Sequence, residues 1–543
     1  MAGVKVFRAV ALLLFLSISA VAQENRYMVF FKDKEGIPQT LANPIDFLSE
    51  KAIQRRLSQG IEVSELDLPV RRSYVEGVRN TGADVFFTTR WLNGLLIQCD
   101  ISVLPAVEAL SFVEGVELVA PHSGLQNPGR MAFNLRRKQN AVGVQTESQL
   151  QMLGIHKMHE ANYKGEGITI AILDSGFPGV DVSPAFQNIF SESRFAEKVS
   201  YDFVHNSPDV FQYDGHGTEV LSVIAAEVPD AFTGGAYEAT FQLFITEDVP
   251  SENRIEEYNW LFAAEKADSA GADIIHSSLG YYDFDDPAMN YSLEQMDGKT
   301  AVVTRAAQWA ADRGIVVVTS AGNEGNIPTW RIVTAPADGE DVLAIGAVNS
   351  ARVKTGTSSI GPAADGRIKP DLAALGAGVK VVKATGQIST ASGTSLSAPL
   401  VTSLVAGVME RYPDLSGKEV TSLLRRTASQ SNNPDNLLGY GIPNFQAVVN
   451  YQERSSQMRP FEVFPNPLKD DTLTVSPSDP DVIESCIIEI VSSQGLVLQK
   501  GTVRFDWLNR NYQMNLSGYP AGIYFIRVFA EKRRYSFRVV KLS

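Results

Sequence analysis

The chain has 543 residues, of which 44% are hydrophobic and 20% charged, a balance that argues against a disordered or membrane-embedded chain. Its 62 acidic residues outnumber its 48 basic residues, which gives a formal net charge of −14. Because nucleic-acid binding depends on cationic side chains that neutralise phosphates, this charge argues against a nucleic-acid partner. The length predicts about two to four domains.

The N-terminus has the pattern of an export signal. Basic residues precede an apolar run at 9–22, which ends in the small-x-small cleavage motif Ala20-Val21-Ala22. That run is too short for a permanent membrane anchor, and no later stretch is long enough to be one. We therefore expect a signal peptide at 1–22, no transmembrane segment and an exported protein.

The segment 24–122 has the pattern of a small α+β domain. Strand patterns occur at 26–31 and 94–101, and helical spacing of apolar residues occurs at 44–59 and 68–82. The polar stretch 123–145 then predicts an exposed linker. Its basic cluster Arg136-Arg137-Lys138 is either a proteolytic site or a solvated charge run.

Strand and helix patterns alternate in the central segment 146–452. The strand patterns are at 167–174, 271–280, 314–323, 341–349 and 378–384. This alternation predicts a doubly wound α/β domain with a mostly parallel sheet, whose functional residues gather at the carboxyl ends of its strands. Ser416 and Glu419 form a capping-box pattern that predicts a late surface helix.

The C-terminal segment 458–543 changes character. Short strand patterns follow one another, separated by turn signals roughly every 8–12 residues, which predicts a β-sandwich. The two cysteines, Cys99 and Cys486, fall in different predicted domains, and neither has a histidine or a second cysteine nearby in the sequence. A thiolate metal site and a cysteine protease are therefore disfavoured.

Four polar residues of the central segment stand where chemistry is expected. Asp174 ends the first predicted strand, His216 lies between two glycines at a helix start, and Asn323 follows another strand. Ser395 lies in the first turn of a long apolar helix, where the positive end of the helix dipole favours a developing anion. Each alone also has an ordinary explanation: a cap or turn residue for Asp174, Asn323 and Ser395, and a surface or core histidine for His216. Their order along the chain, Asp, His, Asn and Ser, is that of a subtilisin-type serine protease.

The central segment resembles the subtilase family of subtilisin-like serine proteases. The matching stretches are "AILDSG" around Asp174, "DGHGT" around His216, "SSLG" at 277–280, "SAGNEG" around Asn323 and "SGTSLSAP" around Ser395. The resemblance implies that Ser395 is the nucleophile, His216 its general base, and Asp174 the acid that orients His216. Asn323 is implied to donate to the oxyanion. The implied activity is that of a secreted serine endopeptidase, which cleaves polypeptides through an acyl-enzyme intermediate.

The same resemblance implies a substrate-binding strand. In the family this strand pairs with the substrate backbone, and its candidates here are Ser278, Leu279 and Gly280; the alternative is an ordinary core strand. The implied chemistry requires no cofactor and no metal. Bound calcium is common in the family, but the sequence does not identify ligands for it.

An acidic loop at 281–300 follows this strand. Together with Glu247, Asp248 and Glu252 it suggests an acidic cleft that prefers basic residues upstream of the cut. The alternative is a solvated or calcium-binding loop.

The flanking domains carry resemblances of their own. Residues 24–122 resemble the inhibitory propeptides of secreted subtilases, with the tail 117–122 as the part expected to occupy the cleft; the alternative is a permanent binding domain. Residues 458–543 resemble the sorting domain of type IX secretion in Bacteroidota. The matching stretches are 463–475, 487–501 and 516–528. This resemblance implies passage through the periplasm, the secretion machinery as a partner, and an extracellular or cell-surface product. The alternative is a carbohydrate-binding or adhesive domain.

Other function classes fit the sequence less well. Sedolisin-type peptidases share the fold but use acidic residues where this chain has His216 and Asn323. A lipase or esterase needs a G-x-S-x-G elbow, whereas the motif around Ser395 is G-T-S-L-S. A surface-carried pseudoprotease would normally have lost one of the implied catalytic residues.

Overall fold

The computed structural model describes residues 24–121, 145–457, 461–478, 485–505, 509–530 and 533–542. The expected signal peptide at 1–22, the basic cluster and nearly all of the expected linker at 123–145 lie outside these residues. The chain divides into two compact units, Met1–Ala447 and Val448–Ser543. In the described part of the chain, no helix is long and apolar enough to span a membrane.

The N-terminal domain contains a four-stranded antiparallel sheet in the order β2-β3-β1-β4. Its elements are β1 Asn25–Phe31, α1 Glu50–Gln59, α2 Arg72–Arg79, β2 Asp84–Thr89, β3 Gly94–Cys99, α3 Leu104–Glu108 and β4 Val113–Ala120. The predicted α+β character is therefore confirmed. Helix α1 begins later than the apolar spacing predicts because the Ser49 hydroxyl accepts a hydrogen bond from the Ala52 N–H and caps it.

The central domain is built on a seven-stranded sheet in the order β13-β12-β11-β10-β5-β9-β6, and each neighbouring pair is parallel. Its strands are β5 Thr169–Asp174, β6 Tyr201–Asp202, β9 Thr240–Ile245, β10 Ile274–Ser277, β11 Val316–Ser320, β12 Val342–Val348 and β13 Leu372–Leu375. These strands are mostly continuous apolar runs because helices cover both faces of the sheet.

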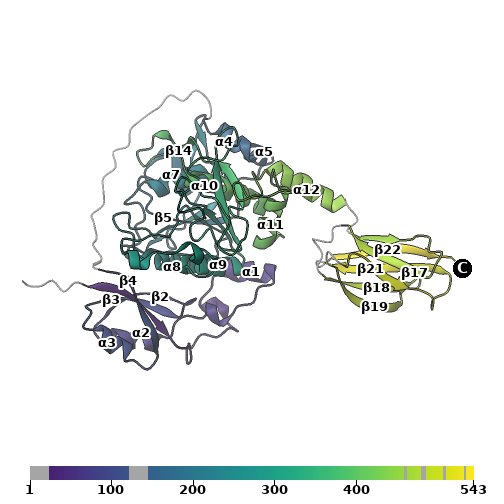
Figure 1. The fold of residues 1–543 in the computed structure, drawn as a ribbon, viewed down its shortest axis with the longest axis horizontal. Helices are drawn as coiled ribbons and strands as arrows, with labels where there is room; N and C mark the ends of the chain where they lie inside the picture. Colours follow the sequence, from purple (N-terminus) through teal and green to yellow (C-terminus); the bar gives the residue numbers. More distant parts are fainter. Residues whose placement is uncertain are drawn as a thin grey trace, which may run out of the picture. The chain divides into compact units, whose positions relative to one another are not determined.

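The helices around the sheet include α7 His216–Ala225, α8 Ile255–Ala270, α9 Val302–Asp312, α10 Thr394–Arg411 and α11 Gly417–Thr427. The shorter or flanking elements are α4 Glu147–Met152, α5 Ile155–Glu160, α6 Gln187–Ser191, the hairpin β7 Glu227–Val228 and β8 Phe232–Thr233, and α12 Phe445–Gln457. Helix α11 begins with the predicted capping box of Ser416 and Glu419. Figure 1 shows α8 and α9 on the side of the domain that faces the N-terminal sheet.

One predicted strand does not belong to the parallel sheet. Residues Val379–Val382 form β14, which pairs antiparallel with β15 Ile388–Ala391 in a separate two-stranded ribbon. The connection between them is too short for a parallel crossover, which needs about a dozen residues or more. The segment 378–384 does contain a strand, as predicted. The prediction that this strand belongs to the parallel sheet was wrong, because it pairs with β15 instead.

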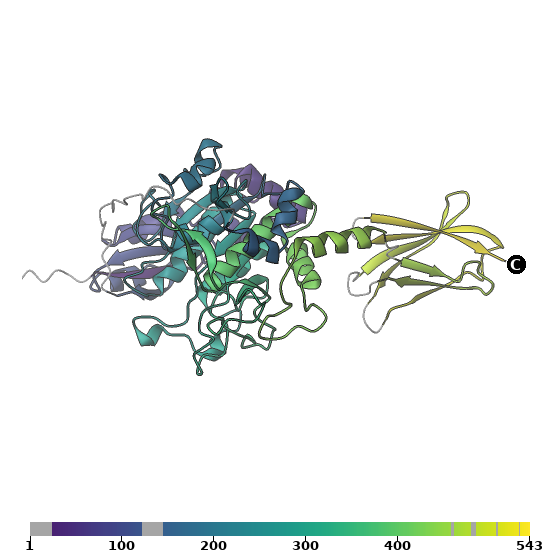
Figure 2. The ribbon, with the colours of Figure 1, turned by 90° about the horizontal axis from the view of Figure 1, so that it is seen from above.

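The C-terminal unit consists of two antiparallel sheets around one apolar core, as predicted. One sheet has the order β16-β17-β20 and the other β19-β18-β21-β22, and they form separate layers in Figure 2. The strands are β16 Phe461–Phe464, β17 Thr472–Pro477, β18 Ser485–Ser492, β19 Val497–Arg504, β20 Tyr512–Asn515, β21 Gly522–Ala530 and β22 Arg533–Lys541. Residues such as Leu473 and Ile526 pack between the two sheets.

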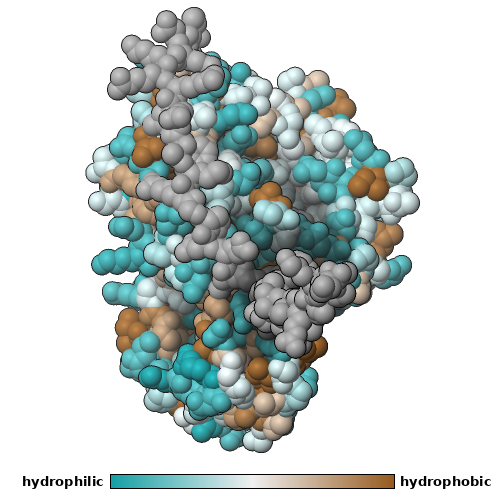
Figure 3. Space-filling view, turned by 90° about the vertical axis from the view of Figure 1, so that its left-hand side faces the viewer, coloured by the Kyte–Doolittle hydropathy of each residue, from teal (hydrophilic) through white to brown (hydrophobic). Residues whose placement is uncertain are grey.

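The N-terminal domain docks on the central domain through a shared apolar core. Met28, Leu96 and Val119 of its sheet belong to the same buried cluster as Trp260 on α8. On the face drawn in Figure 3, by contrast, hydrophobic residues lie in small groups among hydrophilic ones. The contact between the two domains therefore buries apolar surface, which is the main source of association free energy.

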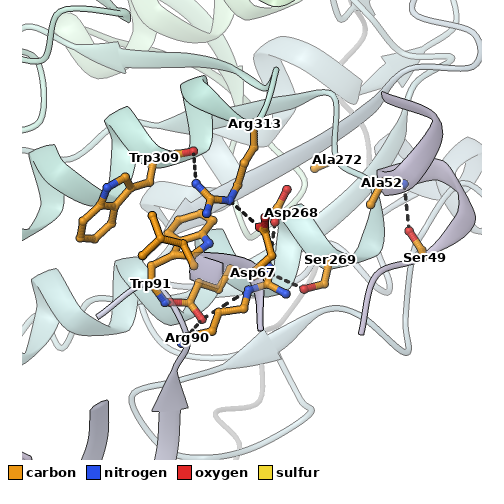
Figure 4. Close-up of polar contacts among 12 residues, drawn as sticks. Ser49, Ala52, Asp67, Arg90, Trp91, Asp268, Ser269, Ala272, Trp309 and Arg313 are labelled. Atoms are coloured by element: carbon orange, nitrogen blue, oxygen red, sulfur yellow. Dashed lines mark hydrogen bonds and ion pairs between the residues drawn. The ribbon is translucent and has the colours of Figure 1, made fainter. Parts of the chain in front are cut away.

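Buried charges accompany this apolar contact. Asp268 on α8 is fully buried and pairs with Arg55, Arg56 and Arg90 of the N-terminal domain. In the opposite direction, the Arg313 guanidinium donates to Asp67 at 2.8 Å (Figure 4). Burial would raise the pKa of Asp268, but the surrounding guanidinium groups outweigh it and hold the pKa below its usual range. Asp268 therefore stays ionised in the interface.

Most of the tail predicted at 117–122 is part of the sheet of the N-terminal domain. Residues 117–120 belong to β4 and pair with β1, with Met28 opposite Glu117 and Arg26 opposite Ala120. The Tyr258 hydroxyl of α8 also donates to Glu117 at 2.6 Å. These four residues are fixed in the sheet and do not form a free strand in the cleft, and the end of the predicted tail lies outside the described residues.

Candidate active site

The carboxyl end of β5 and the start of α7 bring two of the predicted residues into contact. Asp174 is fully buried, and its Oδ1 atom lies 2.8 Å from Nδ1 of His216. The N–H of Ser175 donates to the same carboxylate oxygen at 2.8 Å. Asp174 therefore holds the imidazole with Nδ1 toward itself and Nε2 directed elsewhere.

The charge around His216 favours its protonated form. Burial would lower the pKa of His216, but the Asp174 carboxylate outweighs it and raises the pKa to about 9. Asp214 and Glu219 add to the rise with their negative charge. Asp174 thereby stabilises the imidazolium that forms when His216 takes up a proton, whereas the neutral imidazole, the form that acts as a general base, predominates only above this pKa.

Ser395 is the second residue of α10, so its backbone N–H is among the first N–H groups of the helix, which lack intrahelical partners. The chain reaches this position through Gly393, whose φ of 148° lies in a region that favours glycine. The Ser395 hydroxyl donates to the carbonyl oxygen of Ser278 at 3.3 Å. Among the hydrogen bonds of the described residues, none joins it to His216. A serine hydroxyl changes rotamer readily, and such contacts often tighten only when substrate is bound.

Asn323 follows β11 and faces the same helix start. Its amide oxygen accepts hydrogen bonds from the N–H and the hydroxyl of Thr394, at 3.0 and 3.1 Å. The amide NH2 group is thereby left to donate to another ligand beside Ser395. Thr394 was not singled out from the sequence, although it stands within the serine motif itself.

The predicted substrate strand ends earlier than expected, because β10 stops at Ser277. Ser278, Leu279 and Gly280 continue as chain without strand pairing, next to Ser395. The Ser278 side chain is buried and its hydroxyl donates to the Ser395 carbonyl at 2.8 Å. Leu279 offers its carbonyl to the Ser320 hydroxyl at 3.2 Å. The Ser278 side chain therefore supports the helix start, while the backbone of this segment borders the site.

The acidic residues near this segment carry less charge than their number suggests. Burial raises the pKa of Glu247 to about 8, and the Tyr281 hydroxyl donates to its carboxyl group at 2.6 Å. Burial and the nearby Asp283 raise the pKa of Glu252 to about 7. Glu247 is thus mostly protonated and Glu252 partly protonated at neutral pH. Within the described residues, no group of three or more His, Cys, Asp or Glu side chains is arranged to hold a metal ion.

Comparison with protein families assigns a model to each domain. Residues 165–441 match the subtilase family, residues 26–133 match a peptidase S8 propeptide domain of Bacteroidota, and residues 462–541 match a secretion system C-terminal sorting domain. The subtilase match contains Asp174, His216, Asn323 and Ser395.

Individual relatives agree with these family matches. Subtilisin NAT of Bacillus subtilis subsp. natto is 28% identical over 294 residues, covering 54% of this chain and 68% of that protein. Subtilisin DY of Bacillus licheniformis is 27% identical over 304 residues, covering 55% of this chain and 97% of that protein.

A solved structure is also similar. The epidermin leader peptide processing serine protease of Staphylococcus aureus matches 78% of this chain and 98% of its own, at 16% identity and a TM-score of 0.54. At that identity the likeness concerns the fold alone.

Proposed function

This chain belongs to the subtilase family of serine endopeptidases, and we propose that Ser395, His216 and Asp174 form the triad with which it hydrolyses peptide bonds. The observation that carries the proposal is the 2.8 Å contact between the buried Asp174 carboxylate and Nδ1 of His216, beside the helix start that holds Ser395. A buried carboxylate fixes the tautomer in which Nε2 is free to take a proton.

In the proposed reaction, Oγ of Ser395 attacks the peptide carbonyl carbon while Nε2 of His216 takes the hydroxyl proton. The Asn323 amide and the Ser395 N–H stabilise the negative oxygen of the tetrahedral intermediate. The C–N bond then breaks, and His216 passes its proton to the leaving amine. A water molecule repeats these steps on the acyl-enzyme and releases the second product. No cofactor takes part.

The proposal is tested with Ser395→Ala, His216→Ala and Asp174→Asn in the processed enzyme. If the three residues act as a unit, each single variant loses most of the activity, and the Ser395→Ala/His216→Ala double variant is no slower than either single variant. Effects that multiply in the double variant would contradict a shared mechanism. Circular dichroism of each variant checks that the fold is kept.

The N-terminal domain is a subtilase propeptide domain, and we infer that it inhibits the enzyme until it is removed. Support comes from its buried docking on α8, where Asp268 pairs with three of its arginines. The mature N-terminus is expected between residues 120 and 150, so an active enzyme that retains residue 24 would contradict the inference.

The C-terminal unit is a secretion sorting domain, which makes the protein a secreted one, extracellular or attached to the cell surface. We infer that it is exported to the periplasm first and that the type IX machinery then carries it across the outer membrane. A chain truncated at residue 457 is expected to accumulate in the periplasm. Its appearance in the medium at the full-length level would exclude this route.

We also propose a substrate preference from the acidic loop at 281–300 and the nearby Glu247 and Glu252. We expect only a modest enrichment of Lys and Arg upstream of the cut at neutral pH, because the raised pKa values of Glu247 and Glu252 remove part of the charge. The enrichment is expected to grow at pH 9, where both groups ionise. A peptide-library profile without basic enrichment at either pH would exclude the preference.

A further inference from the structure

A fully buried histidine lies two residues before the segment 278–280, which borders the candidate active site. His276 is on β10 and is 0% exposed. Its neighbour Ser277 accepts a hydrogen bond from the Trp260 indole on α8 at 3.0 Å. Because successive side chains of a strand point to opposite faces, His276 and Ser278 face the other side of the sheet, toward α10.

A continuous chain of hydrogen bonds runs from His276 to the proposed nucleophile. Nδ1 of His276 lies 2.7 Å from the Thr402 hydroxyl, and Nε2 lies 2.9 Å from the Ser278 hydroxyl. That hydroxyl donates to the Ser395 carbonyl at 2.8 Å, and the Ser395 hydroxyl donates to the Ser278 carbonyl at 3.3 Å. His276 is therefore connected to the backbone of Ser395 through the Ser278 hydroxyl, and the Ser395 hydroxyl in turn contacts the backbone of Ser278.

The directions of these bonds follow from counting protons. The Ser278 hydroxyl has a single proton, which it gives to Ser395, so it must accept from the Nε2–H of His276. Nδ1 then carries no proton and accepts from the Thr402 hydroxyl. A neutral imidazole satisfies every bond of the chain. Burial keeps it neutral, since it lowers the pKa of His276 to about 3.

Thr402 connects His276 to a second point on α10. It lies seven positions after Ser395 on α10, which is about two helical turns, so both residues are on the same face of the helix. His276 thereby ties the end of β10 to α10 at two levels, through Thr402 and through the first turn. The first turn of α10 holds Ser395, and the end of β10 leads into the segment 278–280.

We propose that His276 is a positioning residue that, by way of the Ser278 hydroxyl, holds the Ser395 nucleophile in register with the segment 278–280. The inference rests on the proposed role of Ser395 and adds a residue outside the triad to it. His276 does not touch the reacting atoms, and it exchanges no proton during the reaction.

The test compares His276→Leu with His276→Gln in the processed enzyme, by kcat and KM on one peptide substrate and by thermal unfolding. Leucine fills the space without hydrogen bonds, so kcat is expected to fall about 10- to 100-fold, as for other small displacements of a nucleophile, while KM changes less than about threefold. A glutamine amide can donate to Ser278 and accept from Thr402, so His276→Gln is expected to recover most of the lost kcat.

Ser277→Ala is the matched control, because it removes a buried hydrogen bond from the adjacent residue on the opposite face. It is expected to lower the melting temperature and to leave kcat near the wild-type value. If His276→Leu behaves like Ser277→Ala, His276 only stabilises the fold and the proposal is wrong. A wild-type enzyme that does not cleave the peptide would instead contradict the proposed function itself.

Two further variants keep the test decisive if His276→Leu does not fold. Thr402→Val preserves the side-chain shape and removes the donor to Nδ1, so a smaller loss of kcat is expected, and wild-type kcat would refute the proposal. Ser278→Ala removes the group through which His276 acts. Adding Thr402→Val in that background is then expected to leave kcat unchanged, and a further loss would contradict the proposed route.

Discussion

Replacing Asp268 by Asn tests how the propeptide domain is held. The substitution keeps the shape of the side chain and removes the charge that faces Arg55, Arg56 and Arg90, whose side chains are 4%, 1% and 9% exposed. Removing one partner of a buried ion pair costs about 3–5 kcal/mol. Two of these arginines keep other hydrogen-bond partners, so the expected cost lies at the lower end of that range.

The compensation can be read from the remaining contacts. Arg56 keeps Asp67 at 3.1 Å, and Arg90 keeps the Glu265 carbonyl at 2.9 Å. With a cost of about 3 kcal/mol, and about 1.4 kcal/mol for each tenfold change, the inhibition constant of the propeptide should rise about 100-fold. The mature enzyme should keep its activity, because Asp268 is on the outer helix α8, away from His216 and Ser395.

The assay is a titration of processed enzyme, wild type or Asp268→Asn, with propeptide released during maturation. Asp312→Asn is the matched control, since Asp312 is 47% exposed and its ion pair with Lys418, at 3.3 Å, is at the surface. Exposed pairs contribute about 0–1 kcal/mol, so its inhibition constant should change less than about fivefold. If Asp268→Asn and Asp312→Asn are inhibited equally well, the buried ion pairs do not hold the propeptide.

Three other predictions concern the site and its surroundings. The pKa of His216, raised to about 9, predicts that kcat/KM increases with pH with a midpoint near that value, because the imidazole must lose its proton to act as a base. Asp214→Asn should lower this midpoint, and a profile that is flat from pH 6 to 9 would contradict the raised pKa. Asn323→Ala should lower kcat about 10²- to 10³-fold with little change in KM, the magnitude being that of the subtilisin asparagine that serves as the reference case; an unchanged kcat would remove Asn323 from the oxyanion site. Gly280→Ala should destabilise the enzyme by about 1–3 kcal/mol, because the added Cβ would lie 2.3 Å from Oγ1 of Thr334. Thr334→Ala should then restore the melting temperature, and a melting temperature that stays low would show that the strain lies elsewhere.

Much of the domain plan could be predicted from the sequence because each domain has a distinct pattern. The parallel sheet follows from apolar strands that alternate with helices, and Asp174 and Asn323 stand at strand ends where such sheets place functional groups. Strand β14 was assigned to the wrong sheet because its apolar pattern says nothing about its partner. The short connection to β15 was the signal that could have corrected it.

The remaining features of the site depend on contacts between distant parts of the chain. His276 lies 126 positions from Thr402, and nothing near it in the sequence indicates that they meet. The raised pKa of Glu247 likewise depends on burial, which outweighs the opposing hydrogen bond from Tyr281, so a count of acidic residues overestimates the charge of the cleft. A histidine within an apolar strand was the one local sign that His276 has buried partners.

The first measurement to make is fluorophosphonate labelling of the processed, secreted enzyme, with the labelled residue identified by peptide mapping. A serine activated by a base reacts with this reagent, whereas ordinary serines do not. The proposed triad predicts label on Ser395 that is lost in His216→Ala while the fold is kept. A folded, processed wild-type enzyme that takes no label, or takes it on another serine, would contradict the assignment of Ser395 as the nucleophile.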